Sequence, residues 1–514
     1  MNWKDLMKTA TLLFVALFAF AACSDDDKED PKPVAENAAL LTFGFYQEDN
    51  AGVLSKDYVA QVPAVSATAT SYNIEIPMPS VVDKSALVAR FTVTEGNTII
   101  AGGVAQVSQT TVNDFTVPVD YTVSNSDKSQ NLRYTVTVTK ATNMAWSEVS
   151  VLDAAAVTGD AAITGVYAGA VMKINPKDNL PYIAFGIRGK NSEGKDLDNK
   201  VTVAKFDGSA WAKLGAASFT NKVSGSYYAL DIALDGTPYV AYNDQEATNK
   251  GGISVMKFDG SAWSLVGTAG ITATTAQYVG VAALENSVVA VQQNNKNGDF
   301  AKRALVASTW NGSTWATEAA AEGLYGYAAT GGNGKDAYIL ATGASAPNAY
   351  TIVKANDKSV VAKDYLPEGA KSGYVYGGSV YVASDGTLYL LSVDDATGVA
   401  KMRLSVYKNG AFQTVGGDVL PISSEAYDRH CIVKVAVAPD GTPYVAYNDY
   451  KGDKNVYYLY LDSETKQWVA PIKVADAVGE SADDVNIAFT ATGIGYLTYT
   501  DKTNQIHLFK FAEK

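Results

Sequence analysis

A ten-residue segment, DGTPYVAYND, occupies residues 235–244 and returns unchanged at residues 440–449. Weaker copies are centred on residues 182, 288, 338, 389 and 496, so seven copies follow one another at intervals of 49 to 57 residues. Self-similarity at such a period is typical of folds that stack one supersecondary unit many times. The repeat therefore constrains the fold of the C-terminal part more than any local pattern does.

Each copy has the composition of one strand within a larger antiparallel unit. An apolar strand precedes the copy, and a second hairpin follows it, as in residues 203–211 and 255–263. Those hairpins turn at Asp-Gly pairs, which suit tight turns because both residues tolerate a positive φ. Four strands in about 50 residues make one propeller blade. Residues 144–514 are therefore predicted to form a seven-bladed β-propeller within an all-β protein.

The two ends of this region are predicted to complete one blade together. The last copy ends with a third strand, residues 506–511, and has no fourth. Residues 144–149 match the fourth strand at residues 262–266, since both contain Ala-Trp-Ser. The start of the region should therefore supply the outer strand of the last blade and place Trp146 close to Phe511, which removes an exposed sheet edge.

Residues 37–142 show short strands of alternating polarity, the clearest at residues 72–77 and 134–140. This pattern predicts an immunoglobulin-like β-sandwich without a cysteine pair. Residues 114–123 resemble part of the Ig-like modules near the N-terminus of Bacteroidetes surface proteins. The domain is interpreted as a spacer that lifts the propeller off a membrane, and a binding role of its own is the alternative.

Residues 1–22 have the features of a lipoprotein signal peptide. Lys4 and Lys8 precede an apolar stretch at residues 9–22, which is too short to span a bilayer. Small residues stand directly before Cys23, as lipoprotein processing requires. Cys23 is therefore predicted to carry the lipid (palmitate) that anchors the protein to a membrane. Cleavage at another position, with a coincidental cysteine, is the alternative.

Residues 23–36 are predicted to form an acidic tether. The run Ser-Asp-Asp-Asp-Lys-Glu-Asp begins at Ser24 and precedes Pro31 and Pro33, and such a segment cannot bury a core. The pattern resembles that of surface-exported lipoproteins of the Bacteroidetes. The resemblance implies a lipid anchor in the outer membrane and exposure at the cell surface.

Charge and motifs exclude several classes of function. The net charge of −13 opposes binding to nucleic acid, because like charges repel the phosphate backbone. The Asp-Gly repeats lack the dense carboxylates of a calcium loop, so they are interpreted as turns, and neither a metal nor a cofactor is predicted. Of the two histidines, His507 lies within a strand and is interpreted as structural. No catalytic constellation stands out.

The predicted propeller has two different faces. Turns between the first and second strands and between the third and fourth strands of each blade are short, and we call their side the turn face. Loops between the second and third strands emerge on the opposite side, the variable face, together with the connections between blades. These loops differ in length and sequence, which is where function concentrates on a constant scaffold; they cover residues 188–200, 243–252, 293–303, 394–401 and 448–455.

A tyrosine recurs just before the first strand of each of six blades, and an aspartate replaces it in the seventh. These side chains should ring the mouth of the central channel on the variable face, where tyrosine offers a flat apolar ring and a hydroxyl. Packing of these tyrosines as ordinary strand residues is the alternative. The predicted ligand-binding residues are Tyr167, Tyr227, Tyr278, Tyr327, Tyr376, Tyr427, Asp428, Arg429, His430 and Asp484.

A second aromatic series follows the hairpin turn of most blades. Its members are Trp146, Trp211, Trp263, Trp315, Trp468 and Phe412. Some lectin propellers bind one sugar per blade through such aromatics. Large aromatic rings more often pack between neighbouring sheets, and that interpretation is favoured here.

These observations favour a cell-surface lipoprotein that binds a glycan, or another extracellular polymer, through the variable face. One alternative is a scaffold that binds other proteins in an outer-membrane complex. Another is a polysaccharide lyase or hydrolase built around His430, with Asp428 and the nearby tyrosines as charge and proton partners. Catalysis is the least favoured of the three, and the sequence does not identify a ligand.

Overall fold

The computed structural model describes residues 37–141, 144–294, 303–373, 378–394, 401–418, 433–449, 453–474 and 481–513. Strands dominate these ranges, so the all-β prediction is confirmed. Helix α1 (Ala154–Thr158) is a single short turn that begins after Asp153, whose carboxylate accepts the N–H groups of Ala155 and Ala156. Among the described residues, no helix is long and apolar enough to cross a membrane.

The N-terminal part contains two main sheets and a small one. The first sheet has the strand order β2 (Tyr58–Val59), β1 (Leu40–Phe45), β5 (Arg90–Val93). The second has the order β3 (Ser71–Met78), β10 (Asn131–Lys140), β9 (Val119–Ser124), β6 (Thr98–Ala101), β7 (Val104–Ala105). The small sheet pairs β4 (Leu87–Val88) with β8 (Val112–Asn113).

The two main sheets share one apolar core. Phe45 packs edge-to-face on Phe115 with ring centroids 4.7 Å apart, and Tyr121 packs in the same way on Phe43 at 5.3 Å. The alternation predicted at residues 72–77 is present, since the side chains at the C-terminal end of β3 are alternately buried and exposed. Strand β10 pairs with β3 in parallel and with β9 in antiparallel orientation. The immunoglobulin-like assignment stays a prediction.

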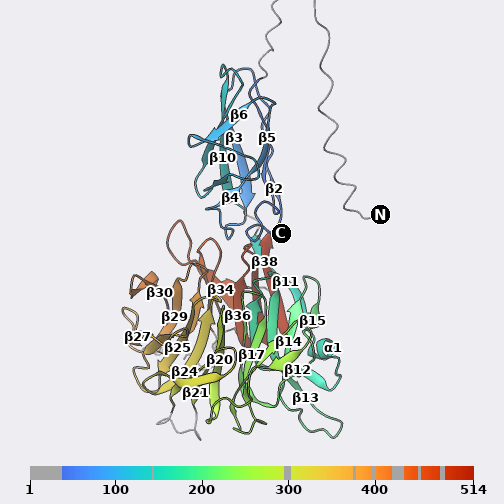
Figure 1. The fold of residues 1–514 in the computed structure, drawn as a ribbon, viewed down its shortest axis with the longest axis vertical. Coiled ribbons are helices and arrows are strands. Elements are labelled where there is room, and N and C mark those ends of the chain that lie inside the picture. Colours follow the sequence, from blue (N-terminus) through green and yellow to red (C-terminus); the bar gives the residue numbers. More distant parts are fainter. Residues whose placement is uncertain are drawn as a thin grey trace, which may run out of the picture.

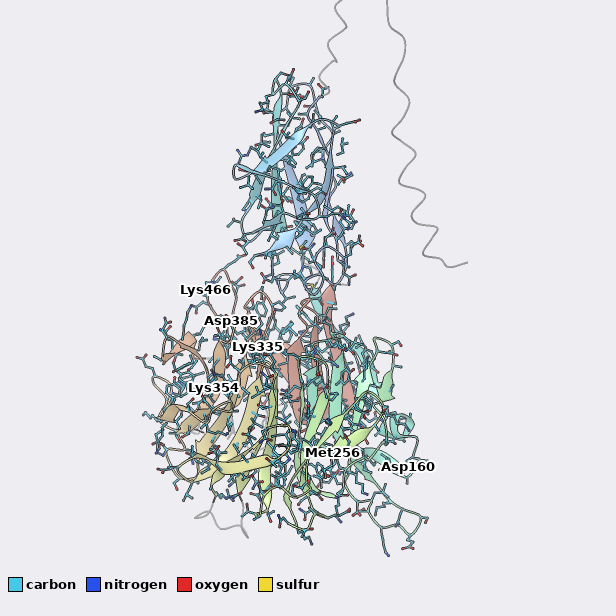
Figure 2. All side chains as sticks on the ribbon, viewed as in Figure 1. Asp160, Met256, Lys335, Lys354, Asp385 and Lys466 are labelled. Carbon is cyan, nitrogen blue, oxygen red and sulfur yellow. The ribbon has the colours of Figure 1, made fainter. Side chains whose placement is uncertain are left out.

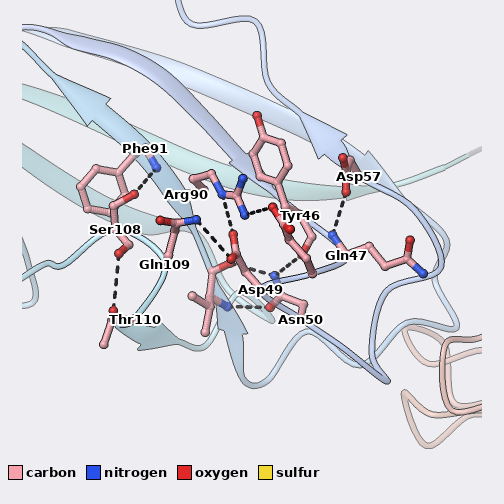
Figure 3. Close-up of polar contacts among 12 residues, drawn as sticks. Tyr46, Gln47, Asp49, Asn50, Asp57, Arg90, Phe91, Ser108, Gln109 and Thr110 are labelled. Carbon is pink, nitrogen blue, oxygen red and sulfur yellow. Dashed lines mark hydrogen bonds and ion pairs between the residues drawn. The ribbon is translucent and has the colours of Figure 1, made fainter. Parts of the chain in front are cut away.

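A polar cluster fastens the loop after β1 to β5. The Nε of Arg90 donates to Asp49 Oδ2 at 2.7 Å, its guanidinium also contacts Glu48, and the same group lies 4.2 Å from the centroid of the Tyr46 ring (Figure 3). The hydrogen bond from Arg90 lowers the pKa of the Asp49 carboxyl. The side chain of Asn50 accepts the N–H of Val88 at 2.8 Å. The loop is thus fixed by charge and hydrogen bonding as well as by the core.

The C-terminal part forms seven four-stranded sheets. Six of them follow chain order, and the first two consist of β12 (Ile163–Ile174), β13 (Pro181–Gly189), β14 (Val201–Phe206), β15 (Trp211–Lys213), and of β16 (Val223–Ile232), β17 (Pro238–Asp244), β18 (Gly252–Phe258), β19 (Trp263–Leu265). The third and fourth consist of β20 (Ala276–Leu284), β21 (Ser287–Asn294), β22 (Leu305–Trp310), β23 (Trp315–Ala321), and of β24 (Tyr325–Gly332), β25 (Ala337–Gly343), β26 (Tyr350–Lys354), β27 (Val360–Tyr365). The fifth and sixth consist of β28 (Ser379–Val382), β29 (Leu388–Asp394), β30 (Lys401–Lys408), β31 (Ala411–Asp418), and of β32 (Val433–Val437), β33 (Pro443–Asn448), β34 (Val456–Tyr460), β35 (Ile472–Lys473). The remaining sheet combines β36 (Ser481–Phe489), β37 (Gly495–Asp501) and β38 (Ile506–Glu513) with β11 (Met144–Leu152).

The first strands of these sheets lie side by side in a closed ring. Each contacts the first strand of the next sheet in the chain, and β36 returns to contact β12. Central first strands with the later strands of each sheet outside them are the arrangement of a β-propeller. Figure 1 shows these sheets from the side, coloured from green to red, below the blue N-terminal sheets.

The predicted pairing of the two ends is present. Strand β11 is antiparallel to β38, with Trp146 directly opposite Phe511. Trp146 is buried, and its ring lies 5.2 Å from that of Phe511 and 5.7 Å from that of Tyr458 in the preceding sheet. His507 on β38 contacts Glu148 of β11 at 2.7 Å through Nδ1, as expected for a structural histidine. The ring is therefore sealed by strand pairing, aromatic packing and a polar contact.

The outer aromatic residues pack between sheets, as the favoured interpretation predicts. Trp263 donates its Nε1–H to the carbonyl of Leu214 in the preceding sheet at 2.7 Å, and Trp315 donates to Val266 in the same way at 2.8 Å. The ring of Trp263 also stacks on Phe219, with centroids 4.0 Å apart. Trp263 and Trp315 thus each hold their sheet to the one before it, which leaves less of their surface for a ligand.

The N-terminal sheets rest on the turn face of the propeller. Val81 is fully buried in a cluster that includes Ala438, at the turn between β32 and β33. A β-carbon at Gly493, in the turn between β36 and β37, would lie 3.0 Å from a methyl group of Val81, so glycine allows the close approach. Lys56 Nζ forms an ion pair with Glu513 Oε2 at 2.6 Å. The contact therefore involves the last two sheets of the ring.

Replacement of the closing indole should weaken the whole propeller. The Trp146→Ala variant is expected to lose about 3–5 kcal/mol of unfolding free energy, because it leaves a cavity between two sheets. Val149→Ala is the matched control, since this side chain on the same strand is 37% exposed and should change stability by less than about 0.5 kcal/mol. Urea denaturation of the two variants measures the difference, and equal stabilities would contradict the role given to Trp146.

Candidate functional site

The variable face points away from the N-terminal sheets. The turn face touches those sheets, and Lys335 and Asp385, in two of its turns, lie at the end of the propeller nearer to them (Figure 2). The loop that follows β13 extends from the opposite end (Figure 1). Loops of the variable face are therefore unobstructed by the rest of the described chain.

The first strands become irregular as they reach the variable face. The pairing register shifts between Tyr167 and Val171 in β12, and the same kind of shift occurs near the start of four further first strands. A β-bulge bends its strand and re-aims side chains, and bulges are common beside functional sites. The irregular stretches contain or directly adjoin the predicted residues Tyr167, Tyr227, Tyr278, Tyr327 and Asp484.

Three of these tyrosines form a continuous row across neighbouring sheets. The rings of Tyr227 and Tyr278 are T-shaped with centroids 6.0 Å apart, and those of Tyr278 and Tyr327 are T-shaped at 5.1 Å. All three side chains are half-buried. Burial raises the pKa of Tyr327 to about 12, so its hydroxyl is neutral and able to donate at physiological pH. Edge-to-face contacts of this kind fix ring orientation.

Two of the predicted residues adopt a backbone conformation that is uncommon for their type. Tyr278 has a φ of 46° and Asp484 a φ of 63°. A positive φ is costly for a bulky side chain and persists only where the surrounding structure enforces it. Such strain is frequent at binding and catalytic positions, so this geometry supports the choice of these two residues.

Tyr167 and Asp484 lie apart from the row but at the same level of the ring. The guanidinium of Arg188, which is exposed, lies 5.1 Å from the centroid of the Tyr167 ring. Asp484 Oδ2 accepts the N–H of Gly169 at 2.6 Å and the hydroxyl of Thr500 at 3.3 Å. Asp484 therefore holds the irregular segment of β12 in place, in addition to any contact with a ligand.

Buried amide side chains hold the tyrosine-bearing segments from behind. Asn243, fully buried at the end of β17, donates to the carbonyl of Ala276 at 2.6 Å, two residues before Tyr278. Gln293 at the end of β21 donates in the same way to the carbonyl of Tyr325 at 2.8 Å, two residues before Tyr327. Each of these two amides thus belongs to the sheet that precedes the tyrosine-bearing strand it positions.

Asn199 performs this role for Tyr227 from a different place in the chain. Its side chain donates to the carbonyl of Gly225 at 2.7 Å. The amide occupies the space that a β-carbon at Gly186 would need, so a loop residue takes the place of a side chain on strand β13. Asn199, Asn243 and Gln293 were not among the residues predicted from the sequence. The repeated Asn-Asp pair that ends each full copy of the ten-residue segment was the available signal for Asn243.

The Asp-Gly turns are satisfied by their own backbone. The carboxylate of Asp259 accepts the N–H groups of Ser261 and Ala262, and Asp207 makes the equivalent bonds. These bonds lower the pKa of both carboxyl groups to about 2. Within the described ranges, no cluster of three or more histidine, cysteine, aspartate or glutamate side chains could hold a metal ion.

Several predicted residues lie outside the described residues. These are Cys23, Tyr376, Tyr427, Asp428, Arg429 and His430. The site that the structure describes is thus the part formed by Tyr167, Tyr227, Tyr278, Tyr327 and Asp484.

Comparison with known proteins adds information about the N-terminal part. Residues 58–138 match the family model described as SGBP, N-terminal. That part of the chain is therefore similar to the N-terminal domain of surface glycan-binding proteins of the Bacteroidetes. The match covers a minor part of the 514-residue chain. No curated protein matches the sequence.

Solved structures with a similar arrangement include the BP39L lectin from Burkholderia pseudomallei, with 11% identity over 68% of this chain and 99% of the lectin, at a TM-score of 0.46. A protein of unknown function from Dyadobacter fermentans has 13% identity over 72% of this chain and 99% of its own, at a TM-score of 0.43. A DUF4623 family protein from Bacteroides eggerthii has 12% identity over 93% of this chain and 99% of its own, at a TM-score of 0.31. All three TM-scores are below 0.5.

Removal of a positioning amide should destabilise the tyrosine row. The Asn243→Ala variant is expected to lose about 1–3 kcal/mol of unfolding free energy, because the buried carbonyl of Ala276 loses its donor. Lys250→Ala, an exposed change in the loop after the same strand, is the control and should leave stability unchanged. Chemical denaturation gives both values. A loss below about 0.5 kcal/mol for Asn243→Ala would show that the amide does not hold this segment.

Proposed function

We propose that this chain is a cell-surface lipoprotein whose propeller binds a glycan through the variable face. In this account residues 1–22 are a signal peptide, Cys23 carries the lipid, residues 23–36 are a tether, and residues 37–142 are an Ig-like spacer. The seven four-stranded sheets are the seven blades of one propeller, residues 144–514. Anchoring is to the outer membrane.

The row formed by Tyr227, Tyr278 and Tyr327 is the observation that carries the proposal. The three rings are half-buried, are held by edge-to-face contacts, and lie at irregular strand ends that amide side chains fix from behind. A preformed aromatic surface suits the apolar faces of sugar rings, and the phenol hydroxyls add directional hydrogen bonds. Rigid placement also lowers the entropic cost of binding.

Two further observations support the proposal. The N-terminal sheets rest on the turn face, so an anchor attached through them would leave the variable face directed away from the membrane. Residues 58–138 match the SGBP family, whose abbreviation stands for surface glycan-binding protein. Fold alone does not determine function, so the assignment rests on the site and this domain together.

Tyrosine variants test the proposal directly. Full-length protein is applied to an array of neutral and acidic oligosaccharides, and the glycans that bind are retested with Tyr278→Ala and Tyr327→Ala. Each variant should reduce affinity about five- to thirtyfold, because loss of a stacking ring removes about 1–2 kcal/mol of contact.

The control is Tyr239→Ala, a half-buried tyrosine at the turn-face end of β17. This variant should bind like the wild type. If all three variants bind equally well, or if no glycan on the array binds, the proposal fails.

A further inference from the structure

A cavity of about 260 Å³ lies in the central channel and extends to the turn-face ends of first strands β12, β24, β28 and β36. It is lined by the first strands β12, β24, β28, β32 and β36. Two residues beyond Tyr327 on β24 is Ala329, and two residues beyond Asp484 on β36 is Asn486; both line the cavity. Its volume is close to the lower end of ligand-pocket sizes, about 300 Å³.

The charged residues that line this cavity are both cations. Among the described residues that line it, Lys173 and Lys434 are charged and none is a carboxylate. Lys173 Nζ already forms an ion pair with Asp231 at 3.2 Å, and Asp231 also accepts the N–H of Ala283 at 2.8 Å. Lys173 is therefore neutralised within the protein, and Lys434 is the remaining charge.

Lys434 differs from Lys173 in its surroundings. Within the described ranges, its ammonium group has neither a hydrogen bond nor an ion pair. Burial lowers the pKa of Lys434, the charge of Lys173 adds to the effect, and Asp484 opposes it from a distance. Lys434 is half-buried and lines the cavity, so its ammonium group presents a positive charge that favours an incoming anion.

Ser379 provides a second donor beside Lys434. Its hydroxyl oxygen accepts the N–H of Val435, the residue after Lys434, at 3.5 Å. That contact places Ser379 of β28 next to strand β32, and both Ser379 and Lys434 line the cavity. Asn486, by contrast, is occupied, because its amide already bonds to Met172, Ala170 and Thr498.

We infer that this cavity binds the carboxylate of an acidic sugar, with Lys434 as its charged partner and Ser379 as a hydroxyl donor. The inference rests on the proposed function and narrows it, since it makes the preferred glycan one that carries a uronic acid. The tyrosine row would then contact neutral sugar faces, while the channel selects the charge.

Calorimetric titration of the full-length protein with glucuronate, glucose and glucose 6-sulfate tests the inference. The wild type should bind glucuronate at least tenfold more tightly than glucose, and Lys434→Met should remove this preference. Lys434→Arg keeps the charge and should retain the preference. Lys257→Met, an exposed change on β18, is the matched control and should behave as the wild type. Thermal unfolding of Lys434→Met should occur at the same or a higher temperature, because methionine keeps the apolar contacts of the side chain and removes a half-buried charge that has no ion pair.

Three results would overturn the inference: no preference for glucuronate in the wild type, a preference that survives in Lys434→Met, or tighter binding of glucose 6-sulfate than of glucuronate. Tyrosine-dependent binding of a neutral oligosaccharide by Lys434→Met would show that the proposed function stands without the acidic subsite. Absence of any tyrosine-dependent glycan binding would reject the proposed function itself.

Discussion

Closure of the ring by strand β11 is the interaction on which the rest of the structure depends. Without β11 the edge of β38 would be unpaired, and no strand from the start of the propeller would belong to its last sheet. Here residues from opposite ends of the propeller share one sheet, with Trp146 opposite Phe511. The closed ring fixes the positions of the seven first strands, and these strands carry both the tyrosine row and the channel cavity.

In the closed ring, the outer strands and the turn face make structural contacts that the variable face does not make among the described residues. The outer indoles are used to join sheets, as the bond from Trp263 to Leu214 illustrates. The turn face is used to support the N-terminal sheets through Val81. Among the described residues, the variable face neither joins neighbouring sheets through indoles nor supports the N-terminal sheets. Its loops and strand ends can therefore have irregular backbone such as that of Tyr278. Strain of this kind is tolerated because the rigid ring around it is over-determined.

Much of the fold could be predicted from particular residues. The two full copies of the ten-residue segment define the repeat, and Trp146 reveals the missing strand because its flanking residues match those of Trp263. Tyr278 and Tyr327 were expected just before their first strands but lie within β20 and β24, because pairing continues past the bulge toward the variable face. The shared level in the ring that their positions predicted agrees with their ring contact. Bulges were not predictable, because they depend on the register between two strands rather than on either sequence alone. The role of Asn199 was not predictable for a related reason: its amide occupies the space of the side chain that Gly186 lacks, which depends on the folded structure. Lys434 stood in an apolar strand and gave no sign that it would remain unpaired in the channel.

The most direct test of the account is a crystal structure of the full-length protein with a bound glycan. The account predicts that a sugar ring lies in van der Waals contact with the side chains of Tyr278 and Tyr327, on the face opposite the N-terminal sheets. A glycan bound instead at the indoles between sheets, or on the N-terminal sheets alone, would contradict it.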